Sequence, residues 1–212
     1  HRDLHSFPTR RSSDLRVDTY TEPLGATTLV NYDFSTSAEP VELYALTDST
    51  QLFDASIAHQ GDISFLVSGD AEKTIQLHET SDNSSWVNWN FTMESNKWEI
   101  GLNPTVPTDL LLDSGSGAVV ADLSGLMLQS LVAYTGSGAA RFTLPVSETP
   151  ITVVLDTGSG AVNLTLTDAT AVTIELESGS GAVHIDIPDG AEVRIELIDG
   201  GSGSLSLPGD AV

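Results

Sequence analysis

The sequence contains no cysteine, which excludes disulfide frameworks, thiolate metal sites, iron–sulfur clusters and cysteine nucleophiles. No apolar run approaches the roughly 18–20 residues of a membrane-spanning helix. Basic residues are scarce: 8 Lys and Arg stand against 30 Asp and Glu among 212 residues, a net charge of −22. Because phosphate binding needs clustered Lys and Arg, we expect no nucleic-acid partner and no docking on an anionic membrane.

The first fifteen residues, His1 to Leu15, have the sequence expected from translating a short-read sequencing adapter. A disordered basic arm is the alternative interpretation. We exclude residues 1–15 from fold reasoning as an artefact and expect no ordered structure there. The rest of the chain carries 5 basic and 28 acidic residues, a net charge of −23. We expect the natural N-terminus, with a signal peptide, lipid anchor or membrane helix, to lie upstream and to hold the domain at the cell envelope.

The tripeptide Gly-Ser-Gly recurs at intervals of 21 or 22 residues, beginning at Gly115, Gly136, Gly158, Gly179 and Gly201. A fixed period near this length is typical of solenoids, in which successive rungs stack. The repeat therefore predicts that residues 105–212 form stacked rungs with Gly-Ser-Gly at one corner.

Apolar residues alternate with polar ones on both sides of each Gly-Ser-Gly, which predicts two strands per rung. After the tripeptide they include Val162, Leu164 and Leu166, and before it Val153 and Leu155. In the last rung the apolar residues are displaced by one, and we expect the additional glycine of Gly200-Gly201 to absorb the shift. The second corner of each rung is rich in Gly, Pro and Asp, and we expect Gly125 and Gly190 to supply positive φ there.

These patterns predict an all-β fold: a right-handed parallel β-solenoid, or single-stranded β-helix, with about 21–22 residues per rung. An antiparallel meander explains the alternation equally well but not the near-identical corners. Residues 16–104 are β-rich and less regular, and we interpret them as an N-terminal cap or as degenerate rungs. Strands are expected there at residues 41–46, 53–59, 62–67, 74–78, 86–91 and 97–102.

The stretch Asn96 to Pro104, the segment Val106 to Leu110 and the Gly-Ser-Gly rungs with Asp122 to Leu126 resemble the bacterial toastrack family. That family includes the C-terminal domain of cell-wall-active-antibiotic-response (LiaF-like) proteins and related adhesin-like proteins. The resemblance implies a β-solenoid attached to the cell envelope, with a role in envelope-stress signalling or adhesion. It implies no catalytic residues and no cofactor.

Two sets of residues are candidates for a binding site. Asp113, Asp156 and Glu177 stand two residues before successive Gly-Ser-Gly corners, so in register they form an acidic edge that Tyr134 interrupts. Oxygen ligands of this kind suit calcium, but we favour a solvated acidic edge and expect no resident metal. His59, His78 and His184 lack partners at metal-ligand spacing, and we expect each at the surface.

The second set is Trp86, Trp89 and Trp98, in a chain otherwise poor in aromatic residues. These rings could form a sugar-binding platform, although packing in the cap is the interpretation we favour.

The sequence favours a non-enzymatic, extracytoplasmic domain of the cell envelope that acts as a scaffold, stress sensor or adhesin-like module. Its partners would be envelope or membrane proteins or cell-surface polymers. A structural module that polymerises through its solenoid ends is the main alternative. A carbohydrate-active enzyme is less favoured because only Arg16, Lys73, Lys97, Arg141 and Arg194 supply positive charge outside the adapter.

Overall fold

The computed structural model describes residues 15–48, 50–80 and 97–208, and within them it contains strands and no helix. The first seven strands are β1 (Arg16–Pro23), β2 (Leu29–Thr36), β3 (Val41–Ala45), β4 (Gln51–His59), β5 (Asp62–Ser68), β6 (Glu72–Thr80) and β7 (Trp98–Leu102). The next five are β8 (Pro107–Ser114), β9 (Val119–Asp122), β10 (Met127–Thr135), β11 (Ala140–Thr143) and β12 (Ser147–Thr157). The last five are β13 (Val162–Thr165), β14 (Thr170–Ser178), β15 (Ala182–Asp186), β16 (Glu192–Asp199) and β17 (Ser204–Ser206).

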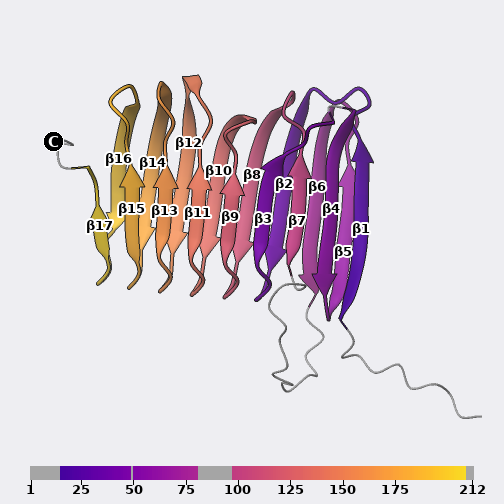
Figure 1. Cartoon of the computed structure of the whole chain (residues 1–212), viewed down its shortest axis with the longest axis horizontal. Coiled ribbons are helices and arrows are strands. Elements are labelled where there is room, and N and C mark those ends of the chain that lie inside the picture. The colour runs from indigo at the N-terminus through magenta and orange to yellow at the C-terminus, as the bar shows by residue number, and fades with distance from the viewer. Residues whose placement is uncertain (1–14, 49, 81–96, 209–212) are drawn as a thin grey trace, which may run out of the picture.

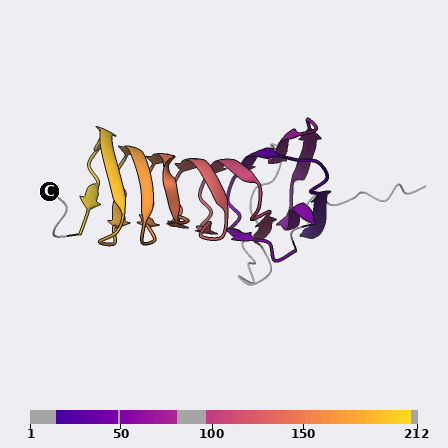
Figure 2. The same cartoon turned by 90° about the horizontal axis from the view of Figure 1, so that it is seen from above.

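The strands form two long sheets that face each other along an elongated molecule (Figures 1 and 2). Sheet A has the order β1-β4-β7-β3-β9-β11-β13-β15-β17, and sheet B has the order β16-β14-β12-β10-β8-β2-β6-β5. From β8 onward each rung contributes one strand to sheet B and the next to sheet A, and successive rungs pair in parallel. The molecule is a β-solenoid, which confirms the predicted fold class.

Parallel pairing continues upstream of residue 105. β2 pairs with β8 and β3 pairs with β9, so β2 and β3 form a rung of the same kind. β6 and β7 pair in parallel with β2 and β3 and form a further rung on the N-terminal side. Along the chain, the rung of β2 and β3 therefore comes first. The rung of β6 and β7 follows it and stacks on its N-terminal side, and the chain then continues with β8, which pairs with the other edge of β2.

Three antiparallel strands close the N-terminal end. β5 pairs with β6, β4 pairs with β7, and β1 pairs with β4. Aromatic rings fill the space between the two sheets here: Phe53 stacks on Phe65 with ring centroids 5.6 Å apart, and Tyr20 contacts Phe65 at 4.9 Å. These large side chains cover the aliphatic interior that a solenoid end otherwise exposes.

The alternating apolar residues point inward and form stacked columns. Val162, Leu164 and Leu166 of one rung are at most 3% exposed, and Val153 and Leu155 are fully buried. In the last rung the apolar residues stay in register, with Leu176 opposite Leu197, and the extra residue is Ile198, before Asp199. The expectation that Gly200 absorbs the shift is therefore wrong, because the bulge lies inside the strand.

The Gly-Ser-Gly corners stack so closely that their glycine positions have no room for a side chain. A Cβ added to Gly138 would lie 1.8 Å from the carbonyl oxygen of Gly117 in the preceding rung. Positive φ is not the reason for glycine at this position, since among the described glycines only Gly25, Gly69 and Gly201 have it.

At the second corners the expected positive φ is absent from both Gly125 and Gly190 and occurs instead at Ala169, with φ of 62°. The expectation for the two glycines was therefore wrong. At Gly125 the restriction is again one of space, because an added Cβ would lie 2.8 Å from the Ala45 side chain.

Candidate functional site

The outer face of sheet B is built by the polar positions of the alternating pattern. Over residues 108–114 of β8, 131–135 of β10, 151–157 of β12 and 172–178 of β14 every second residue is buried, so the intervening side chains point to solvent. Parallel pairing in register then aligns equivalent side chains of neighbouring strands about 4.8 Å apart. The outcome is a set of straight rows that run along the length of the solenoid.

One row contains the predicted acidic edge. Asp113 pairs with Tyr134, Tyr134 with Asp156, and Asp156 with Glu177. The row ends at Asp199 of the last rung. The register that the sequence predicted is thus present, and Tyr134 separates Asp113 from the two carboxylates that follow. Within the described residues no group of three His, Cys, Asp or Glu side chains lies close enough to hold a metal ion.

A second row on the same face is apolar at its centre. Leu111 of β8 pairs with Val132 of β10, which pairs with Val154 of β12. All three side chains are partly exposed, and Tyr134, two residues after Val132, is 43% exposed. We call Leu111, Val132, Tyr134 and Val154 the apolar row. Sequence reasoning passed over it because it searched the outward positions for charged and aromatic groups only.

Carboxylates lie mainly on one side of the apolar row, because the row on the other side holds one carboxylate, Asp109, followed by Ser130, Thr152, Thr173 and Arg194. Asp109 lies two residues before Leu111, and it accepts a hydrogen bond from Ser130 Oγ. Asp113, Asp156 and Glu177 lie on the other side, and Glu175 continues the line of the row beyond Val154. Among the described residues, none of the ion pairs involves Asp113, Asp156, Glu175 or Glu177. This part of the face therefore carries uncompensated negative charge.

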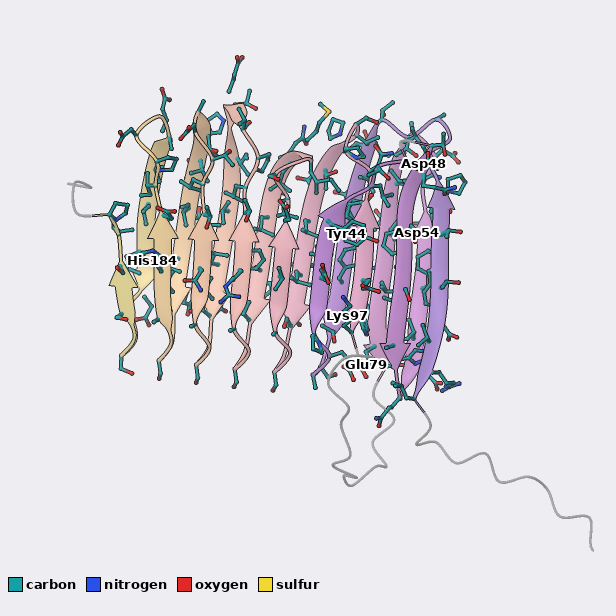
Figure 3. All side chains as sticks on the ribbon, in the orientation of Figure 1. Tyr44, Asp48, Asp54, Glu79, Lys97 and His184 are labelled. Carbon is teal, nitrogen blue, oxygen red and sulfur yellow. The ribbon has the colours of Figure 1, made fainter. Side chains whose placement is uncertain are left out.

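The outer face of sheet A is polar by comparison. Val120 pairs with Arg141, Arg141 with Asn163, and Asn163 with His184, so polar side chains dominate the row. Val120 itself is 47% exposed, and its neighbour on β11 in that row is the charged Arg141. Figure 3 shows His184 near one end of this face and Tyr44, Asp54 and Lys97 toward the other.

Lys97 joins the two acidic residues that oppose each other on β3 and β7. Its Nζ lies 2.8 Å from Glu42 Oε2 and 2.7 Å from Glu99 Oε1. Hydrogen bonds to the two carboxylates raise the pKa of Lys97. The nearby Tyr44 hydroxyl also has a raised pKa, through burial and then the charges of Asp54, Glu99 and Glu42. Lys97 thus offsets a cross-strand repulsion in the capping region.

The tryptophan platform is not assembled by the part of the chain that the structure describes. Trp98 of β7 is fully buried between the sheets, and its ring presents no face to solvent. Its indole Nε1 has no hydrogen-bond acceptor among the described residues. Trp86 and Trp89 lie outside the described residues.

His59 was expected at the surface, and that expectation is wrong: its side chain is 2% exposed. Its Nδ1 lies 2.6 Å from the carbonyl oxygen of Gly61, and its Nε2 lies 3.0 Å from Asp18 Oδ2 of β1. His78 is partly exposed and lies 3.0 Å from Asp33 Oδ1, whereas His184 is exposed on sheet A. The burial of His59 escaped sequence analysis because β1, which supplies Asp18, had not been predicted as a strand.

Glu39 and Glu79 form a carboxyl pair at the corner between β2 and β3. Glu79 Oε2 accepts a hydrogen bond of 3.1 Å from the backbone N–H of Ser37, and Glu39 Oε2 accepts one of 3.2 Å from that of Ala38. Burial, and secondly the charge of Glu79, raises the pKa of Glu39. The pair was not singled out from the sequence, because the two glutamates stand 40 residues apart.

A shallow hollow of about 230 Å³ lies at the second corners, where residues 145–150 protrude at the start of β12. None of its lining residues carries a titratable side chain; they are Pro107, Leu126, Met127, Leu128, Gln129, Pro145, Val146, Ser147 and Thr149. The hollow offers neither an acid–base pair nor a nucleophile with an activating base.

Comparison with known proteins places this architecture in a family. Residues 30–149 match the family described as the N-terminal domain of toast_rack, DUF2154, and because that match spans more than half of the chain, the chain belongs to this family. It has the same fold as a "putative cell adhesion protein" from Clostridium sporogenes, with a TM-score of 0.70 and 19% identity over 92% of this chain and 99% of that one.

A "putative adhesin" from Bacteroides fragilis matches with a TM-score of 0.36 and 14% identity, over 94% of this chain and 98% of that one. No curated protein sequence matches the chain. In the part of the chain that the structure describes, no helix is long and apolar enough to cross a membrane.

Proposed function

We propose that this chain is a non-enzymatic, extracytoplasmic module of the bacterial cell envelope that binds a surface component through an outer sheet face. The observation that carries the proposal is the pair of long, regular outer faces on one continuous solenoid, since such solenoids bind partners over extended surfaces. The names of the structural neighbours, which describe adhesion proteins, support the same class of function. Within this class the role is that of an adhesin-like module, a scaffold or a sensor of envelope stress.

Retention on envelope material tests the proposal. The purified full chain, fluorescently labelled, is incubated with intact bacterial cells and with their isolated cell walls, and the bound fraction is measured against concentration. Saturable retention is expected. An unrelated protein of similar net charge serves as the control, and equal retention of both proteins would contradict specific binding.

A test for turnover addresses the enzymatic alternative. The chain is incubated with acidic and neutral polysaccharides, and new reducing ends or unsaturated products are measured. No product is expected, because the hollow at the second corners has no titratable lining. Product that scales with enzyme concentration would overturn the non-enzymatic assignment.

A second candidate function, end-to-end assembly, is favoured by one observation at the last rung. Leu197 of β16 is 49% exposed and Leu205 of β17 is 38% exposed, and each strand lies at the end of its sheet, with no further strand beside it among the described residues. Edges of this kind can recruit further strands. Sedimentation across a concentration series tests the assembly: growing species support it, and a monomer at every concentration rejects it.

A further inference from the structure

The outer face of sheet B combines an apolar row with carboxylates that take part in none of the ion pairs of the described residues. The apolar row of Leu111, Val132, Tyr134 and Val154 lies across three neighbouring strands, and the carboxylates of Asp113, Asp156 and Glu177 border it on one side. An apolar row bordered by a line of negative charge is complementary to a surface with the opposite charge in the same arrangement. Such a partner has an apolar stripe bordered by Lys or Arg.

The spacing of the rows matches an α-helix that lies along the solenoid axis. Neighbouring rungs are about 4.8 Å apart, close to the helical pitch of about 5.4 Å, so each helical turn can place one apolar side chain on the row. Asp113, Asp156 and Glu177 lie two residues along their strands from the line of the apolar row, or about 7 Å. A helix with side chains is about 10–12 Å wide, so one flank of a helix centred on the apolar row reaches these carboxylates.

A second copy of this chain does not fit the face. Two such surfaces would oppose Asp113, Asp156 and Glu177 to one another, and uncompensated like charges repel. Among the described residues of the outward rows of sheet B, the basic side chains are His78 beside Asp33 and Arg194 at the last rung.

We propose that the outer face of sheet B docks a cationic amphipathic helix of a protein partner, with the apolar side chains of the helix on Val132 and its neighbours. The inference rests on the proposed binding function and names the chemistry of the partner. Tyr134 then has a role that a purely acidic edge leaves unexplained, since its ring widens the apolar row at the position where a carboxylate would otherwise stand.

Val132→Asp provides the sharpest test, because it removes an apolar contact and adds a negative charge. The probe is a synthetic Leu–Lys peptide with leucines at helical spacing, and binding to the full chain is measured by fluorescence anisotropy. If the apolar row carries the interaction, Val132→Asp weakens binding about tenfold. If charge alone carries it, the added carboxylate leaves binding unchanged or tightens it.

Val120→Asp is the matched control. It adds the same charge at a valine on the outer face of sheet A, which is 47% exposed and whose neighbours in its row are Glu42 and Arg141. Binding is expected to stay within about twofold of the unmodified chain. Tyr134→Asp is a second variant of the row that adds a charge at an exposed position, and it is expected to weaken binding as Val132→Asp does. Thermal melts verify that each variant is folded.

Three results overturn the proposal: equal binding by Val132→Asp and Val120→Asp, equal binding of a sequence-scrambled Leu–Lys peptide, or no saturable binding of the helical peptide. Retention of the chain on cell walls is measured on the same samples. Retention without peptide binding rejects the helix as partner and leaves the proposed function standing, whereas loss of both rejects the two together.

Discussion

A Cβ added to Gly160 would lie 1.8 Å from the carbonyl oxygen of Gly138, one rung away. No rotation of a side chain relieves a clash with backbone, so the two rungs must separate. We predict that Gly160→Ala destabilises the chain by about 3 kcal/mol, as overpacking does in other cores. Ser159→Ala, at the exposed middle position of the same corner, should change stability by less than about 0.5 kcal/mol. Urea unfolding measures both, and equal effects of the two variants would contradict close stacking of the corners.

Glu39→Gln is predicted to stabilise the chain at neutral pH. Burial and the charge of Glu79 raise the pKa of Glu39 above its ordinary value of 4.5, so the folded chain favours the protonated carboxyl. That contribution is present below pH 4.5 and is lost as pH rises through the raised pKa. The melting temperature should therefore rise by about 2 °C at pH 7, and the gain should vanish near pH 3. Glu148→Gln, at an exposed position of β12, is the control. A gain that is independent of pH would show that the carboxyl pair is not its cause.

Thr157→Val tests a buried hydroxyl that directly precedes a Gly-Ser-Gly corner. Thr157 is 1% exposed, and its Oγ1 has no hydrogen-bond partner among the described residues. Replacing the hydroxyl with a methyl group should change the free energy of unfolding by less than about 1 kcal/mol, toward greater stability, because no hydrogen bond is lost.

Thr170→Val is the contrasting change. Thr170 is also buried, but its Oγ1 lies 2.7 Å from the carbonyl oxygen of Thr167 and 3.0 Å from that of Pro145. Loss of these contacts should cost about 1–3 kcal/mol. Equal costs for the two variants, measured by urea unfolding, would contradict the assignment of Thr157 as unpaired.

Salt should stabilise the chain through screening of its net charge of −22. We predict that the melting temperature rises from low salt to about 0.15 M ionic strength, where the Debye length is about 8 Å. Sodium and calcium salts at matched ionic strength should act alike. An additional, saturable calcium effect that disappears in Asp156→Asn would instead establish a cation site on the acidic edge.

The regular rungs could be predicted from the sequence because each rung places its equivalent residues in the same surroundings. Leu164 and its counterparts meet the same neighbours in every turn, so their alternation recurs with the period of the corners. The strands expected around residues 41–46, 53–59, 62–67, 74–78 and 97–102 are present as β3, β4, β5, β6 and β7. The strand expected at 86–91 lies outside the described residues.

Strand β2, which forms a rung with the predicted strand β3, was not among the predicted strands for a physical reason. Val30, Tyr32 and Phe34 alternate as clearly as any later strand, but the following corner, Ser37 to Glu39, has no glycine. The segment between β6 and β7, residues 81–97, also contains no glycine, so its sequence does not mark the corner either. The pairing of β3 with β9 also joins segments far apart in the chain, which a periodic pattern does not encode.

The candidate site was predictable only in part. Register alignment of Asp113, Tyr134, Asp156 and Glu177 followed from the repeat. The apolar row was not recognised, because Leu111, Val132 and Val154 each resemble an isolated outward aliphatic residue until parallel pairing places them side by side. The burial of His59 could not be predicted, because His59 is in contact with Asp18 of β1, a strand that the sequence pattern did not reveal.

Retention of Val132→Asp and Val120→Asp on isolated cell walls tests the central claim most directly. Both variants carry the same added charge, Val132→Asp within the apolar row of sheet B and Val120→Asp between Glu42 and Arg141 on the outer face of sheet A. If the chain is a binding module that uses the outer face of sheet B, Val120→Asp is retained like the unmodified chain and Val132→Asp loses most of its retention. Equal retention of the two variants would contradict this account.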